Sequence, residues 1–332
     1  MIKKAIALLS GGLDSTLAVK MILKQGIEVI ALNFTSPFCT CNNGKGGCSE
    51  AMRVARDFGI EMKTIAKGLD YLDVLRHPRY GYGKGVNPCV DCRVYTLKKG
   101  KIFMEEKGAS FIITGEVLGQ RPMSQRRDTL RILERDSGLE GLILRPLSAK
   151  HMEPTLPEKT GIVDREKLLN FTGRSRKPQM MLAEALNVID YPCPAGGCLL
   201  TDRDFSRRVR DLLDNNPAPT IKDLHLLKIG RHFRINGAKV VVGRKEEENK
   251  KIKNLVELGD ILVQPHNFPA PTALIRGGEG KGILRLVVGI ILKYSHNDAN
   301  EERTLLCSEG DKTSFLTVEE PMENKLLARF RV

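Results

Sequence analysis

The sequence has 332 residues and a formal net charge of +13, so it is longer than a usual single domain and strongly basic. Hydrophobic residues make up 41% and charged residues 28% of it, and no apolar run approaches the roughly 20 residues of a membrane span, which excludes a membrane protein. The short apolar start leads directly into a glycine turn without a small-residue cleavage site, which predicts a cytoplasmic protein. The positive charge favours a polyanionic partner such as RNA, with a merely soluble basic protein as the alternative.

Short apolar runs alternate with helical patterns along the first part of the chain. The first run ends at Ser10-Gly11-Gly12, and apolar residues at helical spacing follow it. This alternation predicts an α/β fold with a doubly wound parallel sheet, in which ligands bind at the carboxyl ends of the strands. We expect strands at residues 4–9, 28–34 and 110–114, and helices at residues 17–25, 49–58 and 96–107.

The pattern changes twice further along the chain. Between residues 120 and 177, clustered arginines and several prolines predict a basic, loop-rich stretch able to embrace a substrate. The turn signal at residues 215–219 then leads into short β-like runs at residues 239–242 and 260–264. We therefore expect two domains, with residues 1–205 forming the α/β domain and residues 218–332 forming a smaller α+β domain.

The turn between the first expected strand and helix reads Ser10-Gly11-Gly12-Leu13-Asp14-Ser15. Its glycines let the backbone approach an anion, and the helix N-terminus offers unpaired N–H groups. These features predict a pyrophosphate cradle in which Asp14 holds a cation such as Mg²⁺. The spacing is neither that of a Walker A loop nor that of a dinucleotide fingerprint. The alternative is a glycine turn that only joins a strand to a helix.

This turn resembles the PP-loop of the ATP pyrophosphatases with an adenine nucleotide α-hydrolase-like fold, which split ATP into AMP and pyrophosphate. The stretch 114–120, followed by Ser124-Gln125, is similar to the corresponding part of tRNA 4-thiouridine synthases, as is Leu144-Arg145-Pro146-Leu147. Without the resemblance, the glycines of this stretch indicate only a loop after a strand. The nucleotide-binding residues that the resemblance implies are Ser10, Gly11, Gly12, Leu13, Asp14, Ser15, Asn33, Phe34, Gly115 and Gln120.

Eight cysteines in a cytoplasmic chain favour metal, cluster or thiol chemistry over a disulfide framework. Cys89 and Cys92 form a C-x-x-C pair, and Cys193 and Cys198 lie far downstream. Soft thiolates grouped in this way suit zinc or an iron–sulfur cluster. The segment 87–93 resembles the Asn-Pro-x-x-x-Cys loop of tRNA 2-thiouridylases, in which a distant second cysteine completes the catalytic set.

In cluster-dependent relatives, three cysteines hold a [4Fe-4S] cluster and leave one iron free to present hydrosulfide. The resemblance implies Cys89, Cys92 and Cys193 as the three ligands, with Cys198 competing for the third place. Two alternatives remain open. The same cysteines could carry a persulfide and resolve the resulting disulfide without a metal, or they could form a structural zinc site.

A second group of cysteines, Cys39, Cys41 and Cys48, follows the second expected strand in a loop rich in Gly and Asn. These residues could form a second metal site with a fourth ligand from elsewhere, or supply thiols that relay sulfur near the nucleotide. Cys307 stands alone in the C-terminal domain, and we interpret it as a small buried hydrophobic residue.

The segments 240–249 and 258–263 resemble the NFACT RNA-binding domain. Lys245 replaces the usual Asn of that pattern, and Leu262-Val263-Gln264 replaces its usual Trp-x-His. Because the PP-loop begins at residue 10, we expect any tRNA anchor to lie in this C-terminal domain; the alternative is an accessory domain that only packs on the first. The basic residues able to contact phosphates without reading bases are Arg231, Arg234, Lys239, Arg244 and Lys245.

These features predict an ATP-dependent enzyme that adenylates a uridine carbonyl in tRNA and then replaces AMP with sulfur. We expect ATP, Mg²⁺ and a [4Fe-4S] cluster as cofactors, tRNA and a sulfur donor (sulfide or a cysteine desulfurase) as partners, and no membrane; a homodimer is left open. Two rivals are a PP-loop ligase that passes ammonia to a small molecule and a non-catalytic RNA-binding nucleotide sensor. The expected catalytic residues are Asp14, Cys89, Cys92, Cys193 and Cys198.

Overall fold

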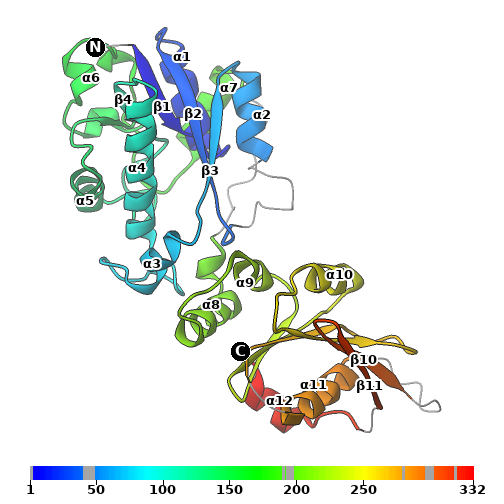
Figure 1. Cartoon of the computed structure of the whole chain (residues 1–332). Helices are drawn as coiled ribbons and strands as arrows, with labels where there is room; N and C mark the ends of the chain where they lie inside the picture. The colour runs from blue at the N-terminus through cyan, green and yellow to red at the C-terminus, as the bar shows by residue number, and fades with distance from the viewer. Residues whose placement is uncertain are drawn as a thin grey trace. The chain divides into compact units, whose positions relative to one another are not determined.

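The computed structural model describes residues 3–39, 49–188, 191, 198–278, 281–295, 303–317 and 320–332. The chain forms two compact units, Met1–Thr201 and Asp202–Val332 (Figure 1). Among the residues described, no helix is long and apolar enough to cross a lipid bilayer. Each unit has its own sheet and core.

The first unit contains a five-stranded parallel sheet in the order β3-β2-β1-β4-β5. The chain winds outward in both directions from β1, so the loop after β1 lies at a topological switch point, where open α/β sheets bind ligands. This topology confirms the predicted doubly wound fold. The strands are β1 (Lys4–Leu8), β2 (Glu28–Thr35), β3 (Met62–Ala66), β4 (Phe111–Ile113) and β5 (Ile143–Leu144).

Helices cover both faces of this sheet (Figure 1). Ala5 and Ala7 of β1 pack in one core, whereas Ile6 between them packs in the other, because successive side chains of a strand point to opposite faces. The first core includes residues of α1 (Leu13–Leu23), α2 (Ser49–Asp57) and α7 (Lys177–Ala185), and the second includes residues of α4 (Cys89–Glu106) and α5 (Arg127–Ser137). The shorter helices α3 (Tyr71–Arg76) and α6 (Leu156–Lys159) complete the α-helices of the described part of this unit.

Two helices differ from the prediction. Helix α4 begins at Cys89, directly after Pro88, so the C-x-x-C pair is helical rather than in a loop before the helix. The stretch expected to be loop-rich contains α5, which buries Leu130 and Leu133 at helical spacing. Most of this stretch is loop, as predicted, but α5 was missed because the dense arginines obscured its apolar stripe.

The second unit contains a six-stranded antiparallel sheet in the order β11-β10-β8-β9-β7-β6. One face packs against α11 (Lys281–Lys293) and α12 (Asn324–Phe330), and the other against α9 (Ile221–Leu226) and α10 (Glu246–Asn254); α8 (Arg203–Asn215) precedes them. This confirms the predicted α+β class of the C-terminal part. The strands are β6 (Arg231–Ile235), β7 (Ala238–Val242), β8 (Ile261–Pro265), β9 (Ala273–Arg276), β10 (Thr304–Glu309) and β11 (Lys312–Thr317).

Candidate active site

The loop after β1 closes onto the first turn of α1 through its serines. Ser10 Oγ lies 3.1 Å from Ser15 Oγ, and Ser15 Oγ donates to the carbonyl of Gly12 at 2.9 Å. Gly11 has a φ of +78°, and a Cβ at this position would lie 2.6 Å from the backbone nitrogen of Ala51, so only glycine fits. The loop therefore presents backbone at a helix N-terminus, which is the arrangement that binds a phosphate group.

The loop after β4 packs against the same turn of α1. A Cβ on Gly115 would lie 2.4 Å from the backbone nitrogen of Ser15, so the two backbones approach as closely as glycine allows. Gln120 Nε2 donates to Asp14 Oδ2 at 2.9 Å. The fold thus brings Gly115 and Gln120 to the loop that contains Asp14, although these residues are about 100 positions apart in the chain.

The carboxylate of Asp14 has one hydrogen-bonded oxygen and one oxygen without a hydrogen-bond partner among the described residues. Oδ2 accepts from Gln120 and lies 3.7 Å from Arg176 Nη2, while Gln179 Nε2 lies 3.4 Å from Gln120 Oε1. Oδ1 is buried and has no hydrogen-bond partner within the described residues. A buried carboxylate oxygen of this kind fits a Mg²⁺ ligand. Arg176 and Gln179 were not predicted, because no sequence pattern relates the start of α7 to the loop.

Asn33 and Phe34 lie near the carboxyl end of β2. They are next to the loop after β1, residues 10–15, which we call the phosphate loop. Asn33 Nδ2 donates to the carbonyl of Leu9 at 2.8 Å, and its Oδ1 is buried without a partner among the residues described. Phe34 packs against the core on the α4 side of the sheet. Asn33 is therefore placed at the switch point, and the contact of either residue with a nucleotide stays a prediction.

The cysteine-bearing segments of the first unit meet near the N-terminus of α4. Cys89 and Cys92 lie in the first turns of this helix. The backbones of Cys39 and Cys198 form an isolated antiparallel β-bridge, and neither thiol is part of a disulfide. Burial, together with the neighbouring thiols of Cys92, Cys198 and Cys89, raises the pKa of the Tyr71 hydroxyl. The described cysteines of both predicted groups therefore lie in one neighbourhood, which the sequence did not indicate for Cys39.

The positively charged ammonium of Lys67 lies beside the sulfur of Cys92. Its Nζ donates to Cys92 Sγ at 2.9 Å and lies 4.8 Å from the centroid of the Tyr71 ring. Burial opposes ionisation of the Cys92 thiol, but Lys67, together with Tyr71 and Arg93, outweighs it and lowers the pKa of Cys92. Burial instead raises the pKa of Cys198 to about 11. Cys92 is therefore the more readily ionised of the two thiols, which is the form that binds metals and attacks electrophiles.

The three-cysteine cluster site is not complete within the described residues. Among these residues, no group of three Cys, His, Asp or Glu side chains is arranged to hold a metal ion. Cys193, the predicted third ligand, lies outside the described residues, as do Cys41 and Cys48. The described residues alone do not fit a [4Fe-4S] cluster.

Buried Glu116 connects the loop after β4 to the cysteine helix. Its Oε1 accepts from Arg93 Nη2 at 2.7 Å, and its Oε2 accepts from Arg145 Nε at 3.0 Å. Burial opposes ionisation of Glu116, but the charges of Arg93 and Arg145 outweigh it and lower its pKa to about 2. Because Arg93 follows Cys92, this carboxylate holds the first turns of α4 beside the loop after β4. Sequence reasoning missed Glu116, although an acidic residue directly after a buried strand is a detectable signal.

Replacing Glu116 with Gln is expected to lower the free energy of unfolding by about 3–5 kcal/mol at pH 7, because two guanidinium groups lose their buried counter-ion. The folded-state pKa of about 2 lies below the ordinary value of 4.5. The stabilisation from this group is therefore complete above pH 4.5 and is lost as the pH falls toward 2. Urea unfolding of the wild type and the variant should show their difference shrinking over that range. Glu105→Gln, on the exposed side of α4, should change stability by less than about 0.5 kcal/mol.

The basic residues predicted to contact phosphates in the second unit are largely paired within it. Arg234 and Lys239 lie 2.8 and 2.6 Å from the carboxylate of Asp211, and Arg244 lies 2.6 Å from Glu248. Burial lowers the pKa of Lys239 to about 8. The charge of Lys239 therefore supports the fold of the second unit and is not exposed to a backbone phosphate.

Two segments of the chain match known protein families. Residues 1–154 match the family described as "Thiamine biosynthesis protein (ThiI)". Residues 230–331 match the "NFACT protein RNA binding domain". These matches confirm the two resemblances found in the sequence.

Similar proteins include enzymes that act on tRNA. A tRNA-specific 2-thiouridylase MnmA of Leptospira interrogans is 33% identical over 127 residues, which cover 34% of this chain and 33% of the relative. A probable tRNA sulfurtransferase of Thermoanaerobacter sp. is 30% identical over 161 residues, which cover 48% of this chain and 39% of the relative. A solved 4-thiouridine synthetase–RNA complex with bound ATP shares 24% identity and a TM-score of 0.36, over 56% of this chain and 51% of that chain. The chain thus spans 33% and 39% of the length of the two curated relatives.

Proposed function

We propose that this PP-loop protein is an ATP-dependent sulfurtransferase that thiolates a uridine in tRNA and releases AMP and pyrophosphate. One observation carries the proposal: Glu116 joins α4, which carries Cys89 and Cys92, to the loop after β4, which packs on the phosphate loop. It follows Gly115, which packs on the loop, and it pairs with Arg93, which follows Cys92. A reaction that adenylates an oxygen and then replaces it with sulfur needs these two sites beside each other. The names of the curated relatives support the same activity.

In the first step, the uridine carbonyl oxygen attacks the α-phosphorus of ATP, and pyrophosphate leaves. The backbone N–H groups at the start of α1 would bind the phosphates. Mg²⁺ bound at Asp14 would supply charge stabilisation for the leaving pyrophosphate. Gln120 and Arg176 hold Oδ2 of Asp14, which leaves Oδ1 for the cation.

In the second step, a sulfur nucleophile attacks the activated carbon, and AMP leaves. In the persulfide form of the reaction, the persulfide of a cysteine desulfurase first transfers its outer sulfur to the Cys92 thiolate, and the terminal sulfur then attacks the base. A second thiolate, from Cys193 or Cys198, then attacks the Cys92 sulfur, so that thiouridine is released and a disulfide forms, which an external thiol reduces. The alternative is a [4Fe-4S] cluster at Cys89, Cys92 and Cys193. In the persulfide form, Lys67 would stabilise the Cys92 thiolate that first accepts the sulfur atom from the donor.

The remaining sequence predictions belong to this proposal. Residues 1–205 would carry both chemical steps, and residues 218–332 would bind RNA. Sulfide would serve the cluster form of the reaction, and a cysteine desulfurase would serve the persulfide form. The reaction would take place in the cytoplasm, and a homodimer remains an open prediction.

The assay that tests the function combines the full chain with ATP, Mg²⁺, a thiol reductant and unmodified tRNA, without oxygen. One arm supplies sulfide, and the other supplies a cysteine desulfurase with cysteine. We expect thiouridine in the digested tRNA, detected by mass spectrometry, with one AMP and one pyrophosphate formed for each thiouridine. Chromatography of the nucleosides then separates 2-thiouridine from 4-thiouridine. AMP formation that needs ammonia and no tRNA would instead identify the ligase. Binding of tRNA and ATP without turnover would identify the nucleotide sensor.

A further inference from the structure

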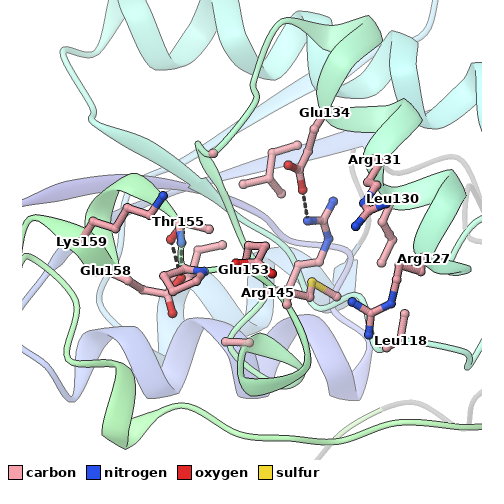
Figure 2. A pocket seen from close by; sticks show the side chains of 16 residues that line it. Leu118, Arg127, Leu130, Arg131, Glu134, Arg145, Glu153, Thr155, Glu158 and Lys159 are labelled. Carbon is pink, nitrogen blue, oxygen red and sulfur yellow. Dashed lines mark hydrogen bonds and ion pairs between the residues drawn. The ribbon is translucent and has the colours of Figure 1, made fainter.

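A cavity of about 260 Å³ lies between α5, the edge strand β5 and the segment that leads into α6. Figure 2 shows the side chains that line it. The described lining contains none of the residues predicted to bind ATP or to carry sulfur. This cavity is therefore a feature that the proposed function does not yet use.

Three guanidinium groups line the cavity (Figure 2). Arg127 and Arg131 lie one turn apart on α5, and Arg145 follows β5. Within the described part of the chain, the guanidinium groups of Arg127 and Arg131 have no hydrogen bond or ion pair. Like charges at this helical spacing repel each other, so an anion between them would stabilise the arrangement.

Arg145 is the buried member of this set, with 2% of its surface exposed. Its Nε donates to Glu116, and its Nη1 donates to Glu134. Its Nη2 is buried and has no hydrogen-bond partner among the residues described. Buried polar groups are nearly always hydrogen-bonded, and the group that Nη2 lacks is an acceptor.

The carboxylates that line the cavity pair with other groups and leave Arg127 and Arg131 without a counter-ion among the described residues. Glu134 is engaged by Arg145. Glu158 accepts from the backbone N–H of Thr155 at 2.7 Å and pairs with Arg165. Glu153 is exposed, and Lys159 offers a further cation from α6. The cavity is therefore built to attract an anion.

We propose that this cavity binds a phosphate group through Arg127, Arg131 and Arg145. Guanidinium groups present paired N–H donors that match phosphate oxygens, and they keep their charge at every physiological pH. The volume is smaller than that of a pocket for a drug-sized ligand, so it suits a single phosphate with little attached to it. The phosphate comes from an RNA backbone or from a free anion. This proposal stands independently of the thiolation reaction.

The test begins with inorganic phosphate, titrated into the full chain by calorimetry. Arg131→Gln and Arg127→Gln should each weaken phosphate binding by at least about tenfold. Arg126→Gln is the matched control, because this exposed residue directly precedes α5, carries the same charge and does not line the cavity. It should bind phosphate within about twofold of the wild type. The PP-loop is the same in the wild type and in all three variants. Any phosphate that binds there therefore contributes equally and cancels when their affinities are compared.

A second arm measures tRNA binding across a series of salt concentrations. If an RNA phosphate occupies the cavity, Arg131→Gln weakens tRNA binding more than Arg126→Gln does, and its salt slope falls by about one. A response in the inorganic arm alone assigns the site to a free anion. If Arg131→Gln and Arg127→Gln match Arg126→Gln in both arms, the proposal is wrong. Circular dichroism should confirm that the variants are folded, as expected for the exposed arginines of α5.

Discussion

Replacing Asp14 with Asn is expected to lower ATP-dependent formation of AMP and pyrophosphate by at least about 100-fold, because a bound cation supplies several kcal/mol of charge stabilisation. Asn has the same shape, so its amide can keep a contact with Gln120, but it lacks the negative charge that holds Mg²⁺. The partnerless Oδ1 of Asp14 is the structural basis for this expectation. The measurement is the rate of pyrophosphate release with tRNA present, over a range of Mg²⁺ concentrations.

The Mg²⁺ series separates a cation role from a folding role. In the wild type, nucleotide binding should strengthen as Mg²⁺ is added, and this dependence should disappear in the Asp14 variant. Asp204→Asn is the control, because Asp204 is also an acidic residue in the first turn of a helix, is exposed, and lies in the second unit. Its rate should stay within about twofold of the wild type. An Asp14 variant that keeps its Mg²⁺ dependence would remove Asp14 from the proposed cation site.

Replacing Cys92 with Ser is expected to lower thiouridine formation by at least about 100-fold while AMP formation changes much less. A hydroxyl cannot carry transferable sulfur and is a poor ligand for iron. The hydrogen bond from Lys67 can be kept by the serine oxygen, so the position should remain folded. The measurements are thiouridine by mass spectrometry and AMP by chromatography from the same reaction.

Iron analysis of the same proteins distinguishes the two ways of holding sulfur. Iron and sulfide in anaerobically purified wild type, lost in the Cys92 variant, would support the [4Fe-4S] cluster. Thiolation by an iron-free wild type with a cysteine desulfurase as the sulfur source would support the persulfide. Cys307→Ser is the control, because Cys307 lies in the core of the second unit, and it should leave thiolation and iron content unchanged. Equal loss of AMP and thiouridine in the Cys92 variant would contradict a role confined to sulfur.

Local patterns in the sequence were sufficient to predict the strand and the helix on either side of the phosphate loop. Glycines at positions 11 and 12 between an apolar run and an amphipathic segment have few structural solutions, and the loop lies between β1 and α1 as expected. The Gly115 and Gln120 roles came from the resemblance, and the fold brings both residues to Asp14. The roles of these residues toward ATP stay predictions, as does the assignment of Cys193, Cys41 and Cys48.

Contacts between distant segments were decided only by the tertiary structure. Three contacts join separate elements, and no local periodicity encodes them. They are the backbone β-bridge between Cys39 and Cys198, the hydrogen bond from Lys67 to Cys92, and the ion pair of Arg176 with Asp14. The sequence by itself determined the fold class and the phosphate loop, because both follow from interactions between residues close in the chain. Packing of the sheet and its helices decided which thiol ionises and where Glu116 and Arg145 lie, because burial and charge pairing depend on which segments meet.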